Sequence, residues 1–195
     1  MSNARRVRQG GRLFYLMGAS GAGKDSLMAY ARQRLEGRDR IHFARRHITR
    51  PAGSGGEDHV AVSAAEFERC LQEGLFAMHW DSHGLRYGVG REIATWLAAG
   101  HDVVVNGSRA YLPEARRLFP ELVGVLVTAT EAVRRERLRS RGREDAAAVD
   151  RRIARGAELQ GQQLDRVLVI ANEGPLEEAG ERLVALLLGE EGACD

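Results

Sequence analysis

The chain has 195 residues, of which 44% are hydrophobic and 29% are charged, as is typical of a soluble globular protein. No apolar run approaches the roughly 18 residues that are needed to span a bilayer. The formal net charge of +2 falls well short of the basic character of nucleic-acid-binding proteins. Composition and charge therefore exclude a membrane protein and argue against nucleic acid as a partner.

The two cysteines and the N-terminal segment indicate where the protein functions. Cys70 and Cys194 lie far apart and have no cysteine or histidine at metal-ligand spacing, so neither a disulfide framework nor a zinc site is predicted. The basic start is followed by an apolar stretch at residues 13–17, which is too short for the core of a signal peptide. We therefore expect a cytoplasmic protein.

Strand and helix patterns alternate through the first half of the chain. A short apolar run leads into a glycine-rich turn and then into a helical pattern that stops at Gly37. Ser63 and Glu66 have the spacing of a capping box at the start of a later helix. In chain order, we predict a strand at residues 12–17, a helix at 24–36, a strand at 41–48, a loop at 51–58, a helix at 63–73, a strand at 75–80 and a helix at 91–99.

The second half continues the alternation, beginning with three consecutive valines of the kind found in a strand buried on both faces. We predict a strand at 103–105, a helix at 111–119, a strand at 122–127, helices at 131–141 and 146–160 separated by a break at 142–145, a strand at 167–170 and a helix at 176–188. This order predicts an α/β fold with a mostly parallel central sheet and helices on both faces, in a single domain covering residues 1–195.

The glycine-rich turn has the pattern of a phosphate-binding loop. Residues 18–24 fit G-x-x-x-x-G-K and lie between a predicted strand and a predicted helix, which is the context that the motif requires. Its backbone N–H groups and the helix dipole favour phosphate, and Lys24, the only lysine among 29 lysines and arginines, would reach the β and γ phosphates. The predicted ATP-binding residues are Gly18, Ala19, Ser20, Gly21, Ala22, Gly23, Lys24, Asp25 and Ser26.

Five segments together resemble the ribose 1,5-bisphosphate phosphokinases, which belong to the guanylate-kinase-like group of P-loop kinases. They are GASGAGKDS (18–26), HITR (47–50), GLRYGVG (84–90), VNGSRA (105–110) and RGRE (141–144). The resemblance runs from about residue 13 to about residue 172. It implies a P-loop kinase fold and transfer of the γ-phosphate of ATP to ribose 1,5-bisphosphate, giving 5-phosphoribosyl 1-diphosphate in phosphonate breakdown. ATP and a small phosphorylated sugar are thus the expected partners.

The resemblance also implies an acceptor-binding lobe at about residues 45–90. Guanylate kinases read the guanine with a glutamate and with a serine or threonine, but the matching positions here are Met78 and Val89, which cannot pair with a base. Arg50 and Tyr87 match residues that hold the phosphate of the acceptor. We therefore expect an acceptor that is phosphorylated and unlike guanine.

A lid at about residues 140–152 is implied in the same way, with arginines that close over the transferring phosphate. Arg137, Arg141 and Arg152 lie in or beside it, and Arg141 and Arg152 match the lid pattern best. With Lys24 they form the predicted catalytic set. No general base is expected, because phosphoryl transfer depends chiefly on positioning and charge neutralisation.

The residue after Lys24 departs from the usual P-loop, in which serine or threonine binds magnesium. Here Asp25 follows, and then Ser26, while Asn106 stands where guanylate kinases often have an aspartate at the end of the central strand. One hypothesis is that Asp25 supplies an oxygen to Mg²⁺, directly or through water, with Ser26 adding a hydroxyl. The alternative is that Asp25 only stabilises the first turn of its helix.

Two other functions remain open at this point. One is a guanylate kinase or a related nucleoside monophosphate kinase, which an acceptor assay distinguishes from a sugar phosphate kinase. The other is a guanylate-kinase-like interaction module without activity, although an intact P-loop argues against it. Binding and turnover of ATP separate the module from both kinases.

Overall fold

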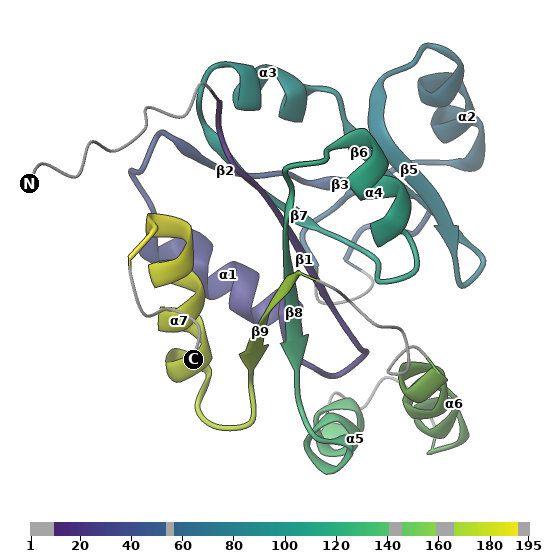
Figure 1. The fold of residues 1–195 in the computed structure, drawn as a ribbon. Helices are drawn as coiled ribbons and strands as arrows, with labels where there is room; N and C mark the ends of the chain where they lie inside the picture. The colour runs from purple at the N-terminus through teal and green to yellow at the C-terminus, as the bar shows by residue number, and fades with distance from the viewer. Residues whose placement is uncertain (1–9, 54–56, 141–145, 159–165, 191–195) are drawn as a thin grey trace, which may run out of the picture.

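The computed structural model describes residues 10–53, 57–140, 146–158 and 166–190. Five parallel strands form the central sheet in the order β2-β7-β1-β8-β9 (Figure 1). Their bounds are Leu13–Gly18 for β1, Ile41–Phe43 for β2, Asp102–Asn106 for β7, Val123–Thr128 for β8 and Val167–Ala171 for β9. Since the strands are parallel, their carboxyl ends meet at one edge of the sheet, where ligands bind in open α/β folds.

Seven helices accompany the two sheets that the described residues form. They are α1 (Lys24–Arg34), α2 (Ala64–Gln72), α3 (Glu92–Ala98), α4 (Leu112–Leu118), α5 (Glu131–Ser140), α6 (Ala146–Glu158) and α7 (Leu176–Leu188). Helices α1 and α7 lie together on one side of the central sheet, while α5 follows β8 and packs against α6 (Figure 1). None of the helices in these ranges has the length and apolar character to cross a bilayer.

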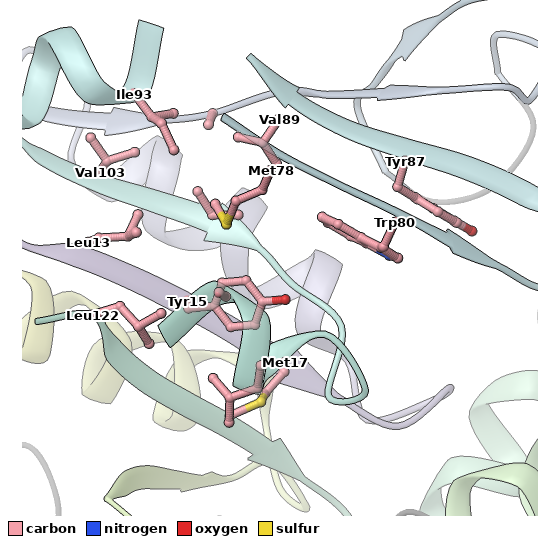
Figure 2. Packing of buried hydrophobic residues seen from close by; sticks show 14 of the residues in the cluster. Leu13, Tyr15, Met17, Met78, Trp80, Tyr87, Val89, Ile93, Val103 and Leu122 are labelled. Carbon is pink, nitrogen blue, oxygen red and sulfur yellow. The ribbon is translucent and has the colours of Figure 1, made fainter. Parts of the chain in front are cut away.

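The alternating side chains of the central strands build two cores, one on each face of the sheet. Phe14 and Leu16 of β1 belong to the cluster that includes Leu27 of α1 and Leu183 of α7. Tyr15 and its odd-numbered neighbours face the opposite cluster, which includes residues of α3 and α4 (Figure 2). Helices therefore cover both faces, which confirms the predicted architecture.

A second sheet of four strands lies between residues 46 and 90, in the order β4-β3-β6-β5. Its strands are β3 (Arg46–Ile48), β4 (Val60–Ala61), β5 (Phe76–Ser82) and β6 (Leu85–Gly90). Met78 and Val89, both fully buried, join the same core cluster as Leu13 and Val103 of the central sheet (Figure 2). The second sheet therefore shares a core with the first.

Two predictions of secondary structure were wrong in detail. The single strand expected at 41–48 is two strands in different sheets, because the Ala44 N–H bonds to Val104 of the central sheet whereas Arg46 pairs with Val89 of the second. Strand β6 was not predicted, since its arginine and glycines weaken the strand pattern. Gly88 is required there because a Cβ would lie 2.5 Å from the ring of Phe76.

Candidate active site

The phosphate loop joins β1 to α1 at the carboxyl edge of the central sheet, as predicted. Gly21 and Gly23 have φ angles of 82° and 89°, in the left-handed region that favours glycine. A Cβ on Gly21 would lie 2.7 Å from the backbone oxygen of Arg134, and one on Gly23 would lie 2.2 Å from Nδ2 of Asn172. Both glycines are therefore required by conformation and by close packing.

Lys24 begins α1 and lies in a hydrogen-bonded triangle with Asp25 and Asn106. Its Nζ donates to Oδ1 of Asp25 at 2.8 Å and to Oδ1 of Asn106 at 2.5 Å, and Nδ2 of Asn106 donates to Oδ1 of Asp25 at 3.0 Å. The side chain of Lys24 is 14% exposed and that of Asp25 is 30% exposed. The end of β7 thus meets the start of α1 through these three side chains.

The triangle keeps Asp25 ionised. Burial raises the pKa of Asp25, but the charge and hydrogen bond of Lys24, the charge of Arg46 and the Asn106 amide together lower it from 3.8 to about 2. An anionic oxygen is thus present beside the phosphate loop at physiological pH. Ser26, the next residue, is exposed and does not join the triangle.

Arg50 lies near a buried ion pair that sequence reasoning missed. Glu57 accepts hydrogen bonds from Nε of Arg46 at 2.6 Å and from its Nη2, with both side chains nearly buried. Nη2 of Arg50 lies 3.9 Å from Glu57 and 3.4 Å from Nδ1 of His59, while its buried Nε has no hydrogen-bond partner among the described residues. The segment from Arg46 to Glu57 thus carries charges of both signs. Hydrophobic patterns in the sequence do not reveal that these charges pair.

Tyr87 is 8% exposed and lies next to Arg46 of this ion pair. Its ring stacks on Trp80 with a centroid distance of 5.6 Å, and the guanidinium of Arg46 lies 4.8 Å from its centroid. Ile48 pairs with Tyr87 in the sheet, so Arg50 follows close to the same pair. The structure thus brings Arg50 and Tyr87 to one region.

A cavity of about 170 Å³ lies beside the start of α1 and the loop that joins β3 to β4. It is lined by Asp25 and Asn106 on one side and by Glu57 and Asp58 on the other, with residues of α1 between them. Ligands that touch Lys24 and ligands that touch the 57–59 loop would therefore be neighbours.

The lid residues are placed in part. Nε of Arg152, in α6, donates to Oγ of Ser20 in the phosphate loop at 3.3 Å. Nη1 of Arg137 donates to the carbonyl of Asn172 at 2.8 Å. Arg141, which was predicted to be catalytic, lies outside the described residues. Arg152 therefore contacts the phosphate loop, and its role in a lid stays a prediction.

Two further arginines beside the phosphate loop were not singled out from the sequence. Arg134 of α5 is 2% exposed and donates from Nε to the carbonyl of Ser20 at 3.0 Å. Arg109 is 9% exposed, and burial and the charge of Arg134 lower its pKa. In a chain this rich in arginine, composition does not separate a buried guanidinium from one on a helix surface.

A glycine loop, a lysine at the start of a helix and a parallel sheet with this strand order define a P-loop kinase. Among solved structures, a guanylate kinase from Anaplasma phagocytophilum has a TM-score of 0.70 at 19% identity, covering 94% of this chain and 88% of that one. A gluconokinase from Sinorhizobium meliloti 1021 has a TM-score of 0.51 at 21% identity, covering 93% and 94%. These similarities establish the fold.

The sequence relatives are closer. A ribose 1,5-bisphosphate phosphokinase PhnN from Thiobacillus denitrificans is 56% identical over 91% of this chain and 93% of the relative. One from Desulfomicrobium baculatum is 50% identical over 91% of this chain and 94% of the relative. No family model matches the chain. On these similarities the chain belongs to the ribose 1,5-bisphosphate phosphokinase family.

Proposed function

We propose that this protein transfers the γ-phosphoryl group of ATP to ribose 1,5-bisphosphate, giving 5-phospho-α-D-ribose 1-diphosphate and ADP. The observation that carries the proposal is the 56% identity, over 91% of the chain, with a relative of that name. An oxygen of the acceptor's 1-phosphate forms a bond to the γ-phosphorus while the bond to the β–γ bridging oxygen breaks. That oxygen leaves with ADP.

Lys24 and the phosphate loop stabilise the charge that this transfer redistributes. The loop places backbone N–H groups at the start of α1, where the helix dipole also favours anions. Nζ of Lys24 bonds to Asp25 and Asn106, which hold it at the carboxyl edge of the sheet. A fixed ammonium stabilises a transition state without having to reorganise during the reaction.

The residues at this edge fit a magnesium ion. Mg²⁺ prefers oxygen ligands, keeps several waters and binds through one or two carboxylates together with substrate phosphates. Asp25 supplies an ionised oxygen, and no three His, Cys, Asp or Glu side chains of the described ranges form a metal cage. Asp25 would hold the ion, directly or through water, and Ser26 would add a hydroxyl. The bound ion would neutralise phosphate charge.

The arginines complete the charge neutralisation, and no general base is needed. The attacking phosphate oxygen is already ionised at neutral pH, so no proton has to leave it. Arg152 lies at Ser20 of the loop, and we expect Arg141 to act with it. Alanine variants of both should reduce turnover more than affinity for ATP.

The acceptor would lie between the phosphate loop and the second sheet, close to the cavity that Asp25 and Glu57 line. Arg50 and Tyr87 would hold its remote phosphate. A guanylate kinase activity is the second candidate because the fold is shared, but the buried apolar side chains of Met78 and Val89 offer no polar partner for guanine. This supports the sugar phosphate over the nucleotide.

A side-by-side assay tests the proposal. Purified protein is given ATP and Mg²⁺ with either ribose 1,5-bisphosphate or GMP, and ADP release and product are measured. We expect activity with the sugar only, and Lys24→Ala should remain folded while losing about a hundredfold or more in rate. Efficient phosphorylation of GMP without sugar activity would contradict the proposal, and the absence of turnover with both would favour a binding module.

A further inference from the structure

The outer side of the phosphate loop is held by a buried arginine that the reaction scheme above does not use. Arg134 lies in the second turn of α5, and its guanidinium donates from Nε to the Ser20 carbonyl at 3.0 Å and from Nη2 to the Ile153 carbonyl at 3.5 Å. A phosphate-binding loop turns N–H groups inward, so its carbonyl groups need donors on the outside. Arg134 supplies such a donor at Ser20.

The charge of Arg134 is costly where it lies. The residue is 2% exposed, and no described Asp or Glu forms an ion pair with it, so its partners there are carbonyl dipoles. Burial lowers the pKa of Arg134, although the charge of Glu131 opposes the shift. An apolar side chain would pack this position at lower cost, since a buried charge without a counter-ion is destabilising. Stability of the fold alone does not account for an arginine here.

The same guanidinium connects the loop to the lid helix. Ile153 is the residue after Arg152, and Nε of Arg152 donates to Oγ of the same Ser20 at 3.3 Å. Arg134 thus contacts the carbonyl of Ser20, and Arg152 contacts the hydroxyl of the same residue. Arg134 also contacts the turn of α6 that carries Arg152. A guanidinium can do this because its planar fork presents donors in fixed directions.

The geometry points to Arg134 as a positioning residue for phosphoryl transfer, which holds Ser20 of the phosphate loop and the α6 turn bearing Arg152 in one arrangement. The inference rests on the proposed function. Arg134 also places a positive charge beside the phosphate loop, and the neighbouring Arg109 adds a second one. A bound triphosphate would neutralise these charges. Arg134 acts through Ser20 and Arg152 and does not itself contact the reacting atoms.

Three variants test this assignment: Arg134→Met, Arg134→Lys and the control Arg135→Met. Arg135 is the next residue of α5 and also connects α5 to α6, through Asp150, but it does not touch the phosphate loop. Thermal unfolding, calorimetric binding of ATP with Mg²⁺, and kcat and KM for the acceptor are measured for each.

Arg134→Met should remain folded, bind ATP about tenfold more weakly and lose about 10- to 100-fold in kcat, with acceptor KM changed less than about twofold. Arg134→Lys should recover part of the ATP affinity but not kcat, because one ammonium does not bond both carbonyls. Arg135→Met should keep both constants within about twofold of wild type.

Wild-type ATP affinity and kcat in folded Arg134→Met would overturn the assignment, and so would losses equal to those of Arg135→Met. If Arg134→Met does not fold, Arg134→Lys decides, and wild-type kcat in that variant overturns the assignment. ATP binding needs no acceptor. A wild-type protein without activity on ribose 1,5-bisphosphate would therefore refute the proposed function, while the binding comparison would still test Arg134.

Discussion

The carboxylate of Asp25 receives hydrogen bonds from an ammonium and an amide at the same oxygen, Oδ1. Asp25 also lines the cavity beside the phosphate loop. A residue that only stabilised the helix dipole would not need Asn106, which comes from a distant strand. The arrangement therefore gives Asp25 a contact beyond its own helix, and its binding of magnesium stays a prediction.

Asp25→Asn tests the magnesium role directly. We expect the Mg²⁺ concentration for half-maximal rate to rise about tenfold, because the anionic ligand is replaced by a neutral amide of the same shape. Ser26→Ala, at the exposed neighbouring position, should produce a smaller rise. A magnesium titration that is unchanged in Asp25→Asn would leave only the helix-stabilising role, which is worth about 0.3 to 1 kcal/mol.

The pKa of Asp25 also predicts how stability depends on pH. Its pKa is lowered on folding from 3.8 to about 2, so the ionised form stabilises the fold above the unfolded pKa, and the stabilisation is lost as pH falls through 2. The free energy of unfolding of the wild type should exceed that of Asp25→Asn by about 1 kcal/mol above pH 4, after allowance for solvent screening. Urea titrations from pH 6 down to pH 2.5 should show the difference shrinking. A difference that stayed constant over this range would contradict the assigned ion pair.

At the scale of elements, the phosphate loop is held from outside by groups that follow other strands. Arg134 comes from the helix after β8, and Asn172, which donates to the carbonyl of Ala22 at 2.7 Å, comes directly after β9. Asn172 is 2% exposed. The loop therefore takes its shape from its own glycines and from the ends of two neighbouring strands.

Gly23→Ala and Gly37→Ala separate the effect of glycine backbone conformation from the effect of close packing against Asn172. Both glycines have φ above 80°, but a Cβ at Gly23 would lie 2.2 Å from Asn172 whereas nothing lies within 4 Å of one at Gly37. Gly37→Ala should therefore cost about 1 kcal/mol from backbone strain alone, and Gly23→Ala should cost at least about 1 kcal/mol more and lose ATP affinity. Denaturant unfolding and ATP calorimetry measure both effects. Equal costs would mean that Asn172 moves aside easily.

Sequence patterns predicted the strand–loop–helix at Lys24 and the alternation of elements because these depend on residues close in the chain. The split of residues 41–48 between two sheets depends on partner strands, Val104 in one case and Val89 in the other, and periodicity contains no information about them. The roles of Glu57 and Arg134 were missed for a related reason. Each is a charged residue buried by contacts from distant segments, which the local sequence does not distinguish from a surface residue.

For the whole molecule, the important relation is between the central sheet, which carries the phosphate loop, and the second sheet, which contains Tyr87 and leads into Arg50. The two sheets share one core cluster, and Asp25 and Glu57 line one cavity. Asp58 also binds Arg32 of α1 at 3.1 Å, which ties the 57–59 loop to the helix that follows the phosphate loop. The shared core and this exposed ion pair therefore connect the two halves of the site.

This division predicts that acceptor and ATP affinity can be changed separately. Arg50 follows β3 of the second sheet, its Nε has no hydrogen-bond partner among the described residues, and Glu57 lies as far as 3.9 Å from its Nη2, so we expect its guanidinium to bind a phosphate oxygen. Arg50→Ala should raise KM for ribose 1,5-bisphosphate about tenfold or more while leaving the calorimetric Kd for ATP within about twofold.

Arg86→Ala is the matched control, because Arg86 lies in the same sheet next to Tyr87 but is paired with Glu68 at 2.8 Å and Asp81 at 3.5 Å. The KM of Arg86→Ala for ribose 1,5-bisphosphate should stay near the wild-type value. A loss of ATP affinity in Arg50→Ala, or an equal rise of KM in Arg86→Ala, would show that Arg50 supports the fold of the site and does not bind the acceptor.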